Sequence, residues 1–279
     1  MACLMISDSA GDMCRELLRL GADARARQST GETPLHFACT MGNTAAIDVL
    51  IEHDPTLMEV TNNFDMVPLS MACQFGRADA IQHMLTRHQA LIKPVIANSW
   101  LSPTAGGTLA VAAASGTGDV ETLRLLLDNG HKPNLTRPNP PGLIRKIAKL
   151  SVFMCRVQKK PGAMFQQFGL AWPCANPLHM AAFLGNIGIV ELMLDATDVD
   201  MAEANQQGFT ALHLASMSGH AHVVERLLAA GAPLDVRDKF MRRTPAMWAK
   251  KRGHTAVAAL LDVAKTKETA PSRGFVCGT

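Results

Sequence analysis

The chain has 279 residues, of which 48% are apolar and 18% charged, and its formal net charge is +3. A disordered chain would combine low hydrophobicity with high net charge, so this composition predicts a folded chain with ample material for a core. The small charge gives no reason to expect nucleic acid or an anionic membrane as the main partner.

Residues 11–23 carry the first regular pattern of the chain, an amphipathic run that ends in a glycine, an alanine and an aspartate. The run predicts one helix that leads into a loop. A phrase with different properties follows it.

This phrase, Gly-Glu-Thr-Pro-Leu-His-Phe-Ala, begins at residue 31 and returns in altered form at 65–72, 174–181, 208–215 and 242–249. With the leucine of each copy as anchor, replaced by Ala246 in the last, the spacing is 34 residues from Leu35 to Leu69, from Leu178 to Leu212 and from Leu212 to Ala246. A glycine follows each anchor by seven residues, and an amphipathic run follows the glycine. The repetition predicts a stack of similar units, each with two helices joined by a turn.

The residue types in the phrase suit the start of a helix. Threonine can accept a backbone N–H as a cap, and proline at the first helical position loses no needed donor. Glycine at the turn between the two helices can adopt a left-handed conformation at little cost. One unit cannot bury its apolar face alone, so stability must come from stacked neighbours.

The middle of the chain follows the period less closely. A copy from 107 fits with Val111 as anchor, and it leaves about eight extra residues in the loop near 96–106. The 67 residues from Val111 to Leu178 are one unit too long, and Ile144 divides them into 33 and 34. Residues 138–173 are therefore either a diverged repeat or a helical insertion.

The period, the T-P-L-H-x-A phrase and the turn glycine resemble the ankyrin repeat over most of the chain. The resemblance implies an all-α ankyrin-repeat solenoid of about seven or eight helix-turn-helix units over residues 1–265. Its first repeat, 1–28, would be truncated, and full repeats would start near 31, 65, 107, 174, 208 and 242. Residues 266–279 lack an apolar period, so we expect a flexible C-terminal tail there.

The family resemblance also implies a non-enzymatic scaffold or adaptor that binds a protein through its concave face and loop tips. It assigns partner contact to the position three residues before each anchor and to those five and six residues after it. Apolar residues at these positions predict an exposed stripe, Met41, Met66, Phe75, Phe183, Leu184, Phe209 and Met217. Such a patch marks an interaction site, unless the chain's own loops or self-association cover it.

A second candidate feature is the basic amphipathic segment 143–160. Such a helix can bind calmodulin or a membrane surface, so a regulated docking module is the alternative function. The competing interpretation is that its apolar side packs into the stack, because Ile144 falls at repeat spacing.

We expect no catalytic residue, cofactor or metal site. The chain lacks the nucleophile-elbow, phosphate-loop and zinc-protease motifs. His36, His179 and His213 belong to the repeated phrase, and the resemblance implies that they form hydrogen bonds between adjacent repeats. They would lie roughly 10 Å apart, the usual spacing of packed helices, which is too far to share one ion.

The sequence also suggests where the protein works. The seven cysteines are odd in number and never spaced C-x-x-C, so we expect reduced thiols in the cytoplasm or nucleus. Asp8 follows the apolar first residues and no basic segment precedes them, so we expect no secretory signal. Residues 162–190 lack charge but contain two prolines and several amides, so we expect no transmembrane segment.

Overall fold

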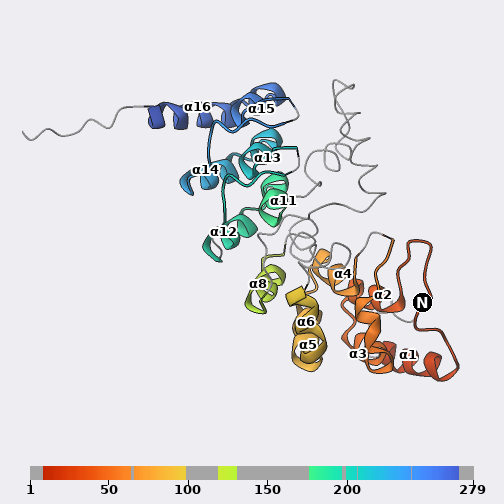
Figure 1. The fold of residues 1–279 in the computed structure, drawn as a ribbon. Helices are drawn as coiled ribbons and strands as arrows, with labels where there is room; N and C mark the ends of the chain where they lie inside the picture. The colour runs from red at the N-terminus through yellow and green to blue at the C-terminus, as the bar shows by residue number, and fades with distance from the viewer. Residues whose placement is uncertain are drawn as a thin grey trace, which may run out of the picture.

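The computed structural model describes residues 9–63, 66–98, 119–130, 176–196, 199–205, 207–239 and 241–269. Every regular element within these ranges is a helix, as the all-α prediction requires (Figure 1). The calls on the opening phrase near 107, on residues 138–173 and on the basic segment 143–160 lie outside the described residues.

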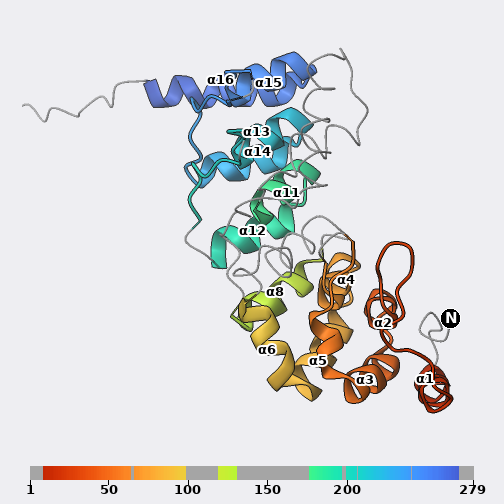
Figure 2. The same ribbon diagram turned by 45° about the vertical axis from the view of Figure 1, so that its right-hand side comes forward.

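The helices form two layers. The inner layer contains α2 (Pro34–Met41), α4 (Pro68–Gln74), α11 (Pro177–Leu184), α13 (Ala211–Ser218) and α15 (Pro245–Arg252). The outer layer contains α1 (Ser9–Arg19), α3 (Thr44–His53), α5 (Ala78–Arg87), α8 (Val120–Asp128), α12 (Ile187–Ala196), α14 (Ala221–Ala229) and α16 (Thr255–Thr269). Each inner helix packs on its own outer helix, and the inner helices pack on one another from α2 to α4 and from α11 through α13 to α15 (Figure 2).

The repeated phrase begins the inner helices, and the predicted side-chain cap is present in α11, α13 and α15. In α11, the side chain of Asn176 accepts the N–H of His179 at 2.8 Å, and Pro177 occupies the first helical position. The helix ends at Gly185, whose φ is +78°. The corresponding Gly219 also lacks room for a side chain, because a Cβ there would lie 2.5 Å from Nδ1 of His254. The turn glycines thus serve both conformation and packing.

The anchor positions form the core, as the period predicts. Leu35, Leu69, Leu178 and Leu212 are at most 2% exposed. The alanine three residues after each of these anchors is completely buried, so neighbouring inner helices can approach closely. One continuous apolar cluster contains residues from α1 to α16. Stability therefore depends on contacts between repeats more than on any single helix.

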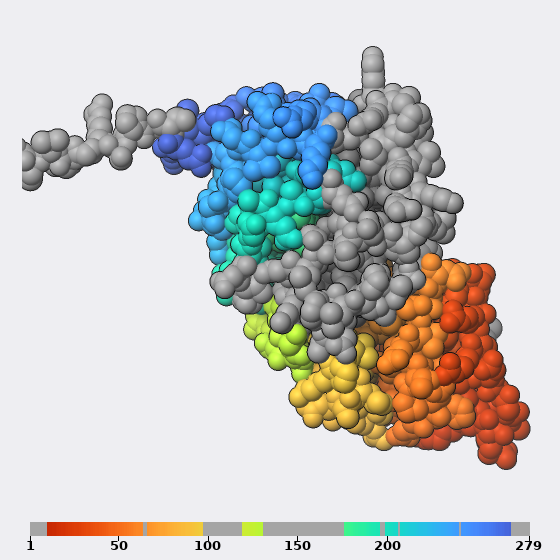
Figure 3. Space-filling model, viewed as in Figure 1, coloured from red at the N-terminus to blue at the C-terminus, as the bar shows by residue number. Residues whose placement is uncertain are grey.

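The outer layer continues through the middle of the chain at α8. This helix packs directly against α5 on one side and α12 on the other (Figure 3). The approach to α12 is close, because a Cβ built at Gly188 would lie 2.8 Å from Cγ2 of Val120. No outer helix stands between α8 and α12 among the described residues. Whether 138–173 is a diverged repeat or a helical insertion stays a prediction.

Two shorter elements lie between the regular repeats. A 3-10 helix, η2 (Pro55–Glu59), connects the unit of α2 and α3 to the next one. After α5 the chain forms α6 (Gln89–Asn98), which packs on α5 and η2. The additional residues that the period places near 96–106 are therefore preceded by a helix of their own.

The two ends of the stack differ from its interior. Helix α1 has no inner partner among the described residues, and Leu17 and Leu20 are 42% and 69% exposed. At the other end, α16 continues to Thr269, four residues into the range predicted as a tail. That part of the prediction was wrong, because Thr-Lys-Glu-Thr extends the helix without needing an apolar side.

None of the described helices is both long enough and apolar enough to cross a membrane.

Candidate functional site

Three histidines join neighbouring repeats through their imidazole rings. Nε2 donates to a carbonyl of the next repeat in each case, from His36 to Met66 at 3.0 Å, from His179 to Glu203 at 3.2 Å and from His213 to Arg243 at 3.1 Å. Nδ1 accepts a backbone N–H at the start of its own helix. The predicted role of these histidines as hydrogen-bonding residues between repeats is confirmed.

This geometry fixes the charge state of the three rings. Because Nδ1 accepts and Nε2 donates, each imidazole is neutral in the fold. Burial lowers the pKa of His179 to about 4, and burial is also the largest cause of the lowered pKa values of His36 and His213. The folded stack therefore requires all three imidazoles in their neutral form.

A second set of hydrogen bonds holds the C-terminal ends of the inner helices. Nε2 of His220 donates to the carbonyl of Phe183 at 3.0 Å, and Nε2 of His254 donates to that of Met217 at 3.1 Å. In the repeat from 65, Arg77 replaces the histidine and its Nε donates to the carbonyl of Thr40 at 2.8 Å. The helix ends to which the family resemblance assigns partner contact are therefore held in place before any partner arrives.

Five of the seven predicted stripe residues are accessible. Phe75 is 41% exposed and Leu184 36%, while Met41, Met66 and Phe183 are partly buried. Met41 is the last residue of α2, and Phe75 occupies the equivalent position as the C-cap of the adjacent helix α4. The five form two groups, which we call the N-terminal patch (Met41, Met66 and Phe75) and the C-terminal patch (Phe183 and Leu184). Whether they bind a partner stays a prediction.

The other two predicted residues are buried, so assigning them to an exposed stripe was wrong. Phe209 is 0% exposed, and its ring packs edge-on against His213 and Trp248, at 5.8 and 5.7 Å between centroids. Met217 is 4% exposed and belongs to the core cluster. Phe209 directly precedes the helix cap Thr210, a position whose apolar side chain commonly packs back on its helix. That signal was present in the sequence.

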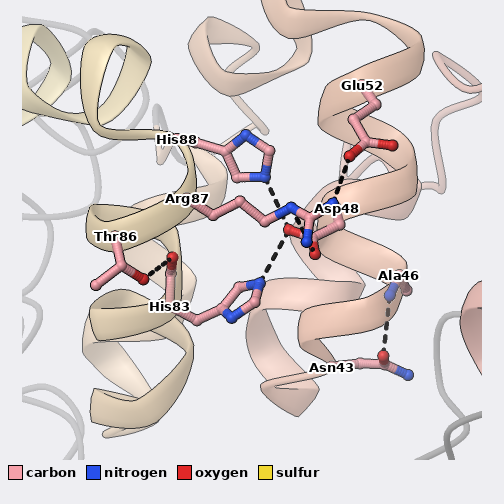
Figure 4. A network of polar contacts seen from close by, with 8 residues as sticks. All are labelled: Asn43, Ala46, Asp48, Glu52, His83, Thr86, Arg87 and His88. Carbon is pink, nitrogen blue, oxygen red and sulfur yellow. Dashed lines mark hydrogen bonds and ion pairs between the residues drawn. The ribbon is translucent and has the colours of Figure 1, made fainter.

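The outer layer contains a polar network that the sequence pattern did not reveal (Figure 4). Oδ1 of Asp48 on α3 accepts Nε2–H groups from His83 at 2.9 Å and from His88 at 2.8 Å. Nε of Arg87 lies 3.2 Å from the other carboxylate oxygen, and its Nη2 lies 2.9 Å from Glu52. The network joins α3 to the end of α5. Its position in the outer layer, away from the inner-helix ends, indicates a stabilising role.

The candidate nucleophiles are inert by position. Cys39 and Cys73 are fully buried in the core, and burial raises the pKa of both thiols. A thiol in such surroundings stays protonated and unreactive. In the described part of the chain, no group of three or more His, Cys, Asp or Glu residues could hold a metal ion.

Comparison with known proteins agrees with the repeats. A family model described as ankyrin repeats, three copies, matches residues 1–94 and 164–238, together more than half of the chain. The probable 26S proteasome regulatory subunit p28 of Saccharomyces cerevisiae is 23% identical over 74% of this chain and 88% of its own length.

Two longer relatives match a larger share of this chain. The E3 ubiquitin-protein ligase KEG of Arabidopsis thaliana is 22% identical over 85% of the chain, and ankyrin repeat protein nuc-2 of Neurospora crassa is 25% identical over 76%. The aligned regions are only 17% and 19% of those relatives' lengths. The chain therefore spans less than a fifth of either relative.

Proposed function

Because the chain belongs to the ankyrin-repeat family, whose repeats generally mediate protein–protein interaction, we propose that it is a non-enzymatic scaffold or adaptor. It binds a protein partner through the exposed ends of its inner helices. The observation that carries the proposal is the pair of accessible apolar patches, each of which includes a helix end, of α2 or of α11, that a hydrogen bond from the next repeat already holds in place.

The physical reason lies in the cost of binding. Phenylalanine, methionine and leucine side chains supply apolar contact area, and aromatic residues and methionine are enriched at the centres of interfaces. A surface that is already ordered loses little conformational entropy when the partner arrives. The N-terminal patch, with Phe75 at 41% exposure, is the first candidate for the anchor of such an interface.

We do not propose ubiquitin-ligase activity for this chain. The chain spans a small share of the ligase relative, and the buried thiols of Cys39 and Cys73 are poor candidates for a nucleophile. The free cysteines Cys39 and Cys73 support our proposal of a reducing setting, in the cytoplasm or nucleus. Calmodulin or membrane docking through 143–160 stays a sequence-based alternative.

The test is affinity capture with the wild-type chain, the variant Met41→Glu/Phe75→Glu and the control Leu91→Glu. Leu91 is 38% exposed on α6 and lies outside both patches, so the control adds a carboxylate to an apolar surface elsewhere. We expect a protein that wild type and control retain and the double variant loses, with unchanged helical circular dichroism. Equal retention by all three chains would contradict the proposal.

A further inference from the structure

The last inner helix carries a cluster of positive charge around one tryptophan. The Cζ atom of Arg243 and the Nζ atom of Lys251 each lie 5.2 Å from the centre of the Trp248 ring, and Cζ of Arg252 lies 5.9 Å from it. The ring is only 2% exposed, and its Nε1 donates to Asp238 at 2.9 Å. The tryptophan is thus a fixed support for three cations, which we call the basic cluster (Arg243, Lys251 and Arg252).

The cluster stands at the partner-contact positions of its repeat. With Ala246 as anchor, Arg243 is three residues before it, and Lys251 and Arg252 are five and six residues after it. Phe183 and Leu184 occupy the last two of these positions in the repeat of α11. The C-terminal half therefore combines an apolar patch with a basic cluster, two repeats apart on one succession of packed inner helices.

Two residues of the cluster, Arg243 and Lys251, have no ion pair in the described part of the chain. Nη1 of Arg243 is buried and has no hydrogen-bond partner there. The pKa of Lys251 is lowered first by burial and then by Arg243 and Arg252. A buried donor without an acceptor and three mutually repelling cations both favour an incoming anion.

The carboxylate of Asp238, which contacts both Arg243 and Trp248, already accepts hydrogen bonds. It is completely buried, and its Oδ2 accepts the N–H of Arg243 at 2.8 Å as well as the indole N–H. Outside the described residues, the sequence has acidic side chains only at Asp8, Asp65 and Asp198. The long stretches 131–175 and 270–279 contain none. These segments have no carboxylate side chain to offer to the cluster.

The backbone conformation beside the cluster also favours a functional role for this end of the stack. Arg242 has φ +57°, in the left-handed region that glycine adopts without strain. Glycine stands at the matching position in two other repeats, as Gly31 and Gly208. An arginine kept in a conformation that suits glycine indicates a use for its side chain. Four basic residues thus gather at this end of the stack.

We propose that the basic cluster binds an acidic segment of the protein partner, with Asp or Glu carboxylates against Arg243 and Lys251. The inference rests on the proposed function and names the chemistry of its partner. An arginine guanidinium pairs with a carboxylate through two parallel hydrogen bonds, which gives the buried Nη1 an acceptor. At about 10 Å per repeat, the cluster lies roughly 20 Å from the C-terminal patch. An extended peptide crosses that distance in about six residues, so the acidic residues follow or precede an apolar anchor at that separation.

The experiment uses fluorescence anisotropy with the full chain and two labelled peptides. Both contain a pair of leucines and a tail, which alternates glutamate with glycine in one peptide and glutamine with glycine in the other. We expect the glutamate peptide to bind wild type, with an affinity that falls as salt screens the charges. In Arg243→Gln/Lys251→Gln the affinity for this peptide falls by at least about tenfold. Equal affinity of wild type for the two peptides would overturn the inference.

Matched variants separate the cluster from net charge and from misfolding. Lys93→Gln/Lys267→Gln removes the same charge from exposed positions on α6 and α16, and it keeps wild-type affinity. Arg242→Gly relieves the left-handed strain, so weaker binding by this variant cannot come from a damaged fold. Equal loss in the cluster variant and the lysine control would mean that net charge alone acts. Displacement of the peptide by inorganic phosphate at constant ionic strength would also overturn the acidic-peptide assignment.

The two proposals can fail separately. A captured partner that depends on Met41 and Phe75 but is retained by Arg243→Gln/Lys251→Gln would leave the scaffold function standing and sink the acidic-segment inference. A glutamate peptide that binds through the cluster, with no partner lost by Met41→Glu/Phe75→Glu, would do the reverse for the N-terminal patch.

Discussion

Acid should destabilise this stack through its buried histidines, and His179 gives the clearest case. Its Nδ1 accepts the N–H of Asn176 at 3.2 Å, and its Nε2 donates to the carbonyl of Glu203. Protonation would place a second N–H against the N–H of Asn176. Burial, the largest cause, lowers the pKa of His179 from 6.5 to about 4. The imidazole of His179 is therefore protonated more readily in the unfolded chain than in the folded one.

The direction of the effect follows from these two values. Because the folded pKa is below the unfolded one, the unfolded chain takes up the proton first. The stabilisation is complete above about pH 6.5 and is lost as the pH falls towards 4. The loss reaches about 2 kcal/mol near pH 5 and about 3 kcal/mol near pH 4. His36 and His213, whose pKa values burial also lowers, act in the same direction.

The assay is urea unfolding followed by circular dichroism at a series of pH values, with wild type and His179→Ser. Serine stands at this position in the repeat from 65, as Ser70, so the variant keeps a residue that the phrase tolerates. We expect the unfolding free energy of His179→Ser to fall less steeply below pH 6.5. The control His53→Ser removes an exposed imidazole and keeps the wild-type slope. Parallel loss of stability in wild type and His179→Ser would refute the reasoning.

Three further predictions concern packing, and each is checked by the free energy of unfolding in urea. Gly188→Ala costs about 1–3 kcal/mol because the new methyl group overpacks against Val120, and the gain in helix propensity offsets part of this cost. In a Val120→Ala background the same substitution is stabilising. A loss of stability in both backgrounds would contradict the contact between α8 and α12. Asp48→Ala costs about 1–3 kcal/mol because two histidine N–H groups lose their acceptor, whereas Glu52→Ala, at an exposed pair, is nearly neutral; equal effects would remove the network from the account. Phe209→Ala costs about 3–5 kcal/mol, and a near-zero effect would mean that the side chain is exposed after all.

The repeat architecture could be predicted because the period constrains the core directly. A leucine recurs every 34 residues, with an alanine and a glycine at constant distances from it. All these leucines pack in one core when the units stack as equivalent repeats. Leu35 and Leu212 are both completely buried as a result. The histidine bonds follow from the same register, because each ring faces the same loop carbonyl of the next repeat.

The errors arose where side-chain packing departs from register. Phe209 occupies a position that the family resemblance assigns to a loop tip, but Trp248 of the next repeat is large enough to cover it. Spacing cannot reveal such a pair, because the two rings come from different units. The middle segment 138–173 has about the length of a repeat, but Ile147 and Ser151 replace the small alanine and the turn glycine, so the period does not decide between a diverged repeat and an insertion.

The central claim is that a partner protein lies against the ends of the inner helices. The most direct measurement is photo-crosslinking in source cells with a benzophenone amino acid at Phe75 and, separately, at Leu91. The account predicts a covalent adduct with another protein from position 75 and none from position 91. An adduct from position 91 alone, or none from position 75, would contradict it.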